Sequence, residues 1–228
     1  MIQIFGVSQG HISSIVNDLA SNLYTQFQPV LYWNPVRLSL QQLQLYVAAV
    51  TATVGVQELG IWGFIDRTVQ PIARPLVGQE EYSSGEEGYH GIKFQSIVTP
   101  DGLISSSIGP EFGSKGDWKL WQQSSIERYL RNFFSESPIL CLYGDPPYAS
   151  AYGIIGPYRA TARNGITPAQ EAMNVTMSSY RIVVEWGFAN VLNQFGFGEW
   201  KRNQGSNMLC AFRTFIQLSN MPTRMELN

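Results

Sequence analysis

Three acidic residues lie inside, or at the end of, apolar stretches of the chain. Asp66 interrupts the aromatic-rich run 60–68, Asp145 closes a second apolar stretch, and Glu185 lies within a third. An ionised carboxylate that leaves water loses much of its solvation, so a buried acid needs a partner. A divalent metal ion is one such partner, because hard cations prefer oxygen ligands. The pattern therefore predicts a site at which three carboxylates meet and bind metal.

The predicted elements place these acids on strands and on a helix. Four strands are expected, at residues 61–65 (extending towards 72), 89–98, 103–108 and 138–143. The turn 99–102, Thr-Pro-Asp-Gly, joins the second and third strands as a hairpin.

Two long helices complete the predicted order, with a further one expected over 207–218. One spans 118–134, and the other begins near Pro168, breaks, and resumes around Ser178. Three strands, a helix, a strand and a helix are the order of the ribonuclease-H-like fold, an α/β fold with a mixed sheet flanked by helices. The acidic loop 78–88 is expected to be a solvated face.

The N-terminal segment is similar to the second half of a helix-turn-helix. Gly6 suits the tight turn, and Ser8 is a good N-cap for the helix that follows. Apolar residues at helical spacing give the helix one apolar face: Ile12, Ile15, Val16 and Leu19. The outer face, where a recognition helix meets DNA, carries Gln9, His11, Ser13 and Ser14. An ordinary capped amphipathic helix is the alternative.

Composition describes a globular protein with a full core and little net charge. The chain has 228 residues, 15 of them basic and 17 acidic, and a net charge of −2. No apolar run reaches the roughly 18 residues that a membrane-spanning helix needs. Cys141 lies in a predicted buried strand, which favours a reduced thiol and an intracellular location. The charge balance gives little support to nucleic-acid binding, which usually shows as a basic excess.

Six motifs occur in the order in which one family carries them. They lie at residues 64–68, 89–98, 100–104, 113–117, 144–148 and 181–188. Together they resemble the nuclease domain of Harbinger-type DDE transposases and their domesticated relatives, from about residue 60 to the C-terminus. The chain would then divide into a partial helix-turn-helix (1–23), a helical connector (24–59) and a DDE nuclease domain (60–228).

The resemblance implies a catalytic triad of Asp66, Asp145 and Glu185, with Asp117 as an accessory acid. It implies phosphodiester cleavage in DNA, and strand transfer, with two Mg²⁺ or Mn²⁺ ions about 3.5–4 Å apart. It also implies a nuclear location, a separate Myb-like DNA-binding partner and action as a homo-oligomer. No membrane association is expected.

Each acid also has a purely structural interpretation. Asp66 could be a core acid paired within the protein, and Asp145 could simply cap a turn. Glu185 could be a helix-surface residue, and Asp117 the N-cap of the helix that begins at Trp118.

The sequence also departs from the family's usual pattern. Arg67 stands where many relatives have glycine, and Trp186 where many have arginine.

Basic side chains in the second half of the chain are candidates for phosphate contacts. They are Lys115, Lys119, Arg181, Lys201 and Arg202. Two functions other than DNA cleavage stay open: a domesticated or decayed relative that binds DNA or protein without cutting, and a phosphoesterase acting on RNA.

Overall fold

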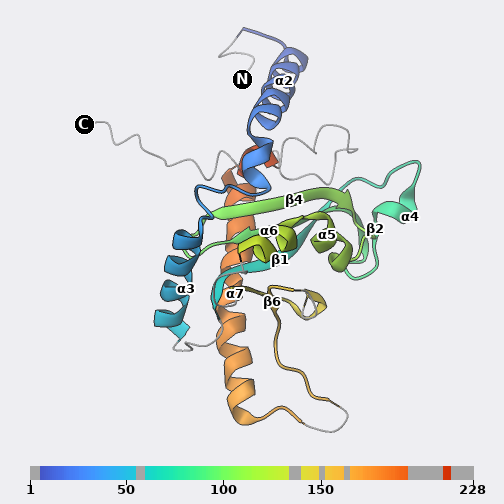
Figure 1. Cartoon of the computed structure of the whole chain (residues 1–228). Coiled ribbons are helices and arrows are strands. Elements are labelled where there is room, and N and C mark those ends of the chain that lie inside the picture. The colour runs from blue at the N-terminus through green and yellow to red at the C-terminus, as the bar shows by residue number, and fades with distance from the viewer. Residues whose placement is uncertain are drawn as a thin grey trace.

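The computed structural model describes residues 6–54, 60–133, 140–148, 152–161, 165–194 and 213–216. Its centre is a mixed sheet in the order β2-β3-β1-β5-β6, with β4 paired to β3. The strands are β1 (Ile61–Pro71), β2 (Ser83–Ser84), β3 (Tyr89–Val98), β4 (Ile104–Phe112), β5 (Cys141–Gly144) and β6 (Ile154–Ile155). β1 is antiparallel to β3 and parallel to β5. This sheet, flanked by helices, confirms the predicted ribonuclease-H-like α/β architecture (Figure 1).

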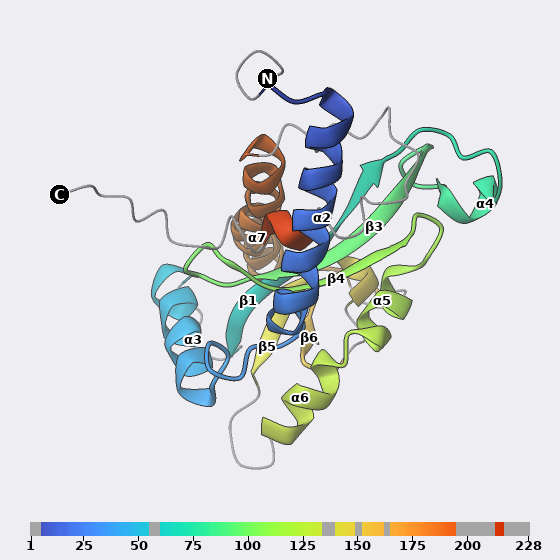
Figure 2. The same ribbon diagram turned by 90° about the horizontal axis from the view of Figure 1, so that it is seen from above.

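Helices cover both faces of the sheet, so the core forms two apolar layers. Helix α7 (Pro168–Gln194) packs on one face through Val184, Phe188 and Val191. Helices α5 (Asp117–Gln123) and α6 (Ile126–Phe133) pack on the other, as Figure 2 shows from above. Side chains of β1 alternate between the layers: Phe64 joins the α7 layer and Ile65 the α5–α6 layer.

The N-terminal helices are α2 (Gln9–Phe27) and α3 (Leu40–Val54), with a 3₁₀ turn, η1 (Gln28–Leu31), between them. Ser8 caps α2 as expected, since its hydroxyl accepts the backbone N–H of His11. Helix α2 runs across the domain boundary predicted at residue 23.

The apolar face of α2 is exposed at three of its four residues. Ile15, Val16 and Leu19 are 51, 45 and 56 % exposed, because this part of α2 extends beyond the sheet (Figure 1). The base of α2 is held by the helical segment 213–216, whose Thr214 hydroxyl donates to the Ala20 carbonyl.

The helix expected over 118–134 is in fact two, because Ser124 ends one and begins the next. The Ser124 hydroxyl donates to the Trp121 carbonyl and accepts the backbone N–H of Ile126. Ser125 has a positive φ of 56°, which a continuing α-helix does not allow.

The break predicted in the last long helix is also wrong, since α7 is continuous from Pro168 to Gln194. The Ser179 hydroxyl donates to the Thr176 carbonyl within the helix and so does not interrupt it.

The remaining strand predictions are confirmed, with shifted ends. β4 continues to Phe112 rather than 108, the short η2 turn (Pro146–Tyr148) follows β5, and the two-residue strands β2 and β6 were not predicted. The helix expected over 207–218 lies mostly outside the described residues. None of the described helices is both long and apolar enough to cross a membrane.

Candidate active site

Asp66 on β1 and Asp145, the residue after the parallel strand β5, lie side by side. Ile65 of β1 is in register with Gly144, the last residue of β5. The residues that follow, Asp66 and Asp145, therefore occupy adjacent positions. Gly144 has to be small here, because a Cβ would come within 2.7 Å of the Ile65 side chain. Gly144 thus allows the two strands to pack closely beside the acids.

Strand alternation turns Asp66 towards α7. Phe64, two residues earlier, packs in the α7 layer, so Asp66 points to the same face. Arg181 and Glu185 lie four residues apart on α7 and therefore on the same side of that helix. Glu185 is exposed, and its negative charge raises the pKa of the Asp66 carboxyl. Asp66 and Asp145 thus lie next to each other between β1, the end of β5 and α7, and Glu185 is close enough for its charge to act on Asp66.

Arg181 links the two aspartates. Its Nη1 pairs with Asp66 Oδ2, and its Nη2 lies 3.5 Å from Asp145 Oδ1. The other oxygen of Asp66, Oδ1, accepts the backbone N–H of Arg67 at 2.8 Å. Both oxygens of the buried Asp66 are therefore engaged, while Asp145 remains half-exposed.

Burial is the main influence on the pKa of the Asp66 carboxyl, and it raises that pKa. The carboxyl is 8 % exposed, and loss of solvation raises its pKa from 3.8 to about 6. The Arg181 guanidinium and the Arg67 N–H lower the pKa, whereas the charges of Asp145 and Glu185 raise it. Burial thus makes the Asp66 carboxyl reluctant to ionise without a cation at hand.

The raised pKa predicts that the metal-free protein becomes more stable as pH falls from 7 towards 4. The folded chain takes up a proton on Asp66 near pH 6, while the unfolded chain does so only near 3.8. Protonation therefore favours the folded state, by about 3 kcal/mol at most. Urea unfolding in EDTA, comparing wild type with Asp66→Asn at each pH, isolates this contribution. Parallel stability–pH curves for the two proteins would contradict it.

The donor set suits a divalent cation, since all three acids offer carboxylate oxygens. Within the described ranges, however, no three His, Cys, Asp or Glu side chains are arranged as a metal cluster. The positive charge between Asp66 and Asp145 is that of Arg181. Residue types therefore fit a metal ion, and Asp66 and Asp145, with Glu185, are the residues that would hold it.

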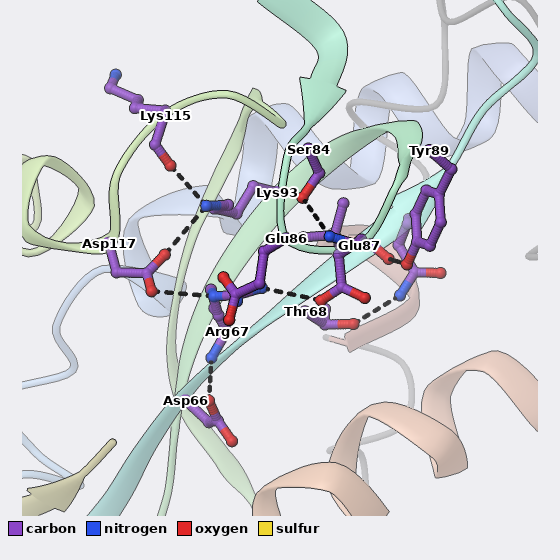
Figure 3. Close-up of polar contacts among 12 residues, drawn as sticks. Asp66, Arg67, Thr68, Ser84, Glu86, Glu87, Tyr89, Lys93, Lys115 and Asp117 are labelled. Atoms are coloured by element: carbon purple, nitrogen blue, oxygen red, sulfur yellow. Dashed lines mark hydrogen bonds and ion pairs between the residues drawn. The ribbon is translucent and has the colours of Figure 1, made fainter. Parts of the chain in front are cut away.

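Asp117 is held by two basic side chains of its own. Gly116, not Asp117, is the N-cap of α5, so the predicted capping role is wrong. The Asp117 carboxylate accepts Arg67 Nε at 2.9 Å and Lys93 Nζ at 3.1 Å. Arg67 follows Asp66 on β1 and points to the opposite face of the sheet, as Figure 3 shows.

Arg67 is the centre of an ion-pair network that the sequence did not reveal. Besides Asp117, it pairs with Glu86 and, at 3.2 Å, with Glu87. Both glutamates come from the acidic loop that was expected to be a solvated face. That interpretation is incomplete: Glu86 is largely exposed, yet both residues tie the loop to β1 beside Asp66 (Figure 3).

The structure describes some, but not all, of the residues predicted to contact DNA. On α2, the side chains of Gln9, His11, Ser13 and Ser14 are all exposed. Lys115 is committed to Glu111 at 2.7 Å and to the Gln123 side chain at 2.7 Å. Lys201 and Arg202 lie outside the described residues.

Comparison with known proteins identifies the family. No curated protein and no solved structure matches the chain. The family model described as DDE superfamily endonuclease matches residues 65–210, a range that contains Asp66, Asp145 and Glu185. The match covers well over half of the 228 residues. On this match, and with the fold in agreement, the chain belongs to the DDE superfamily endonucleases.

Proposed function

We propose that this protein is a metal-dependent DNA nuclease of the Harbinger transposase type. In this proposal it cleaves phosphodiester bonds and joins the freed 3′-hydroxyl to target DNA. The observation that carries the proposal is the adjacency of Asp66 on β1 and Asp145 at the end of β5, within the family-matched region. Arg181 of α7 reaches both carboxylates.

Each acid has a part that follows from its surroundings. When bound, divalent ions stabilise charge on the phosphate oxygens and lower the pKa of water. Asp66 offers Oδ2 from a rigid strand, since the Arg67 N–H holds its other oxygen in place. Asp145 offers a half-exposed carboxylate. Glu185, on α7, is exposed to solvent. A DNA phosphate would therefore reach the acids from the side of Asp145 and Glu185.

Partner and location belong to the same proposal. DNA is the substrate, with Gln9, His11, Ser13 and Ser14 of α2 as exposed contacts. The net charge of −2 favours delivery to DNA by a separate Myb-like protein. The protein would act in the nucleus, as a homo-oligomer.

Nicking of supercoiled plasmid tests the proposal directly. Purified protein, alone and with a candidate DNA-binding partner, should relax the plasmid in Mg²⁺ or Mn²⁺ and leave it intact in EDTA. An RNA substrate of matched sequence serves as the competitor that separates a DNA nuclease from an RNA phosphoesterase. Absence of metal-dependent nicking in every condition would overturn the proposal.

A second function, DNA or protein binding without cleavage, is favoured by one observation. Arg181 occupies the position between Asp66 and Asp145 and neutralises part of their charge without a metal ion. A protein of this kind would bind DNA and yet show no saturable stabilisation by Mg²⁺. A magnesium titration followed by thermal unfolding therefore distinguishes the two functions.

A further inference from the structure

Arg181 is the cation that the paired aspartates hold in this structure. Among the described residues, no other cationic side chain lies within ion-pair distance of either Asp66 or Asp145. The guanidinium spans both carboxylates from a single turn of α7, one turn before Glu185. The guanidinium thus neutralises part of the negative charge of the two carboxylates.

The same oxygens would serve a metal ion. Asp66 Oδ1 is held by the Arg67 N–H, a backbone group fixed within the β1–β3 ladder. Only Oδ2, the oxygen paired with Arg181, is held by a group that can move away. Asp145 likewise presents Oδ1 to Arg181. A cation that enters between the aspartates therefore has to displace the guanidinium.

We propose that Arg181 is a built-in competitor of the metal ion, a positioning residue that stabilises the empty acid pair and must withdraw when metal binds. The inference rests on the metal site of the proposed function, and it adds Arg181 as a residue that lowers the affinity of that site for metal. Withdrawal is feasible because the Arg181 side chain is long, partly exposed and attached to the surface of α7. The guanidinium is then free to meet a phosphate, which matches its planar donors.

The competition predicts that removing the guanidinium tightens metal binding. Arg181→Gln should bind Mn²⁺ roughly tenfold more tightly than wild type, as expected for the loss of one charge-assisted pair. Arg181→Lys, which keeps the charge but cannot bridge both carboxylates, should fall in between. Without metal, Arg181→Gln should be less stable than wild type, and saturating Mn²⁺ should narrow the difference.

The free Mn²⁺ signal in electron paramagnetic resonance measures the affinity, with no substrate present. The titration is done at pH 8, well above the pKa of about 6 of Asp66, so that the carboxyl is ionised in every variant. Arg74→Gln is the matched control, because Arg74 is exposed and bonds the uncharged Gln79. It removes the same charge and should leave Mn²⁺ affinity at the wild-type value. Circular dichroism and urea unfolding check that each variant folds.

Two negative results have different meanings. Equal or weaker Mn²⁺ binding by Arg181→Gln, with binding lost in Asp145→Asn, would overturn the competition while leaving the metal site in place. No Mn²⁺ binding by wild type, Arg181→Gln or Arg181→Lys would overturn the metal site itself, and the competition with it.

Discussion

Asp145→Asn is expected to reduce metal-dependent nicking by about a thousandfold or more. The substitution removes one of the two adjacent carboxylates that would hold the metal ion, and metal stabilisation of the transition state is worth several kcal/mol. Because the Asp145 side chain is half-exposed, its loss should change the free energy of unfolding little. The variant therefore separates loss of chemistry from loss of folding better than a change at the buried Asp66 does.

The measurement compares initial nicking rates on supercoiled plasmid across Mg²⁺ and Mn²⁺ concentrations. Asp18→Asn is the matched control, since Asp18 is an exposed aspartate on α2, far along the chain from the acids. It should retain the wild-type rate. A rate for Asp145→Asn within a few-fold of wild type would remove Asp145 from the catalytic role.

The adjacency of Asp66 and Asp145 was predictable because it depends on local pattern and strand order. Asp66 interrupts an apolar strand and Asp145 follows another, and parallel neighbours bring such positions together. Glu185 required only that its helix pack back onto the sheet. These features follow from periodicity and from the family's motifs, so the fold and the neighbouring positions of Asp66 and Asp145 could be predicted from the sequence.

The surroundings of the acids were not predictable in the same way. Arg67 and Asp117 are 50 residues apart in sequence, and no local pattern joins them. Strand alternation alone places Arg67 on the face opposite Asp66, a signal that could have separated Asp117 from the other acids. The sequence indicates Arg181 only as a candidate phosphate contact. Its ion pair with Asp66 depends on how α7 lies across the sheet, which no local pattern shows.

Asp117→Ala is expected to cost about 3–5 kcal/mol in the free energy of unfolding, the usual effect of removing one partner from a buried ion pair. Lys93 is 6 % exposed, and its ammonium is held by Asp117 and by the Lys115 carbonyl. Without the carboxylate, that buried charge keeps a hydrogen bond but loses its ion-pair partner. Urea unfolding followed by tryptophan fluorescence measures the change.

Two further variants show whether the loss of stability in Asp117→Ala comes from the unpaired charge of Lys93. Lys93→Met with Asp117→Ala removes both charges and should recover a large part of the stability, because an apolar pair often replaces a buried ion pair at little cost. Glu86→Gln alters the same network at a largely exposed carboxylate, and should cost less than about 1 kcal/mol. If Asp117→Ala were as stable as Glu86→Gln, the network would contribute little to the stability of the fold.

A loss of nicking in the folded Asp117→Ala protein would show that Asp117 is an accessory acid. It would then act on Asp66 through Arg67, which follows Asp66 on β1 and pairs with Asp117.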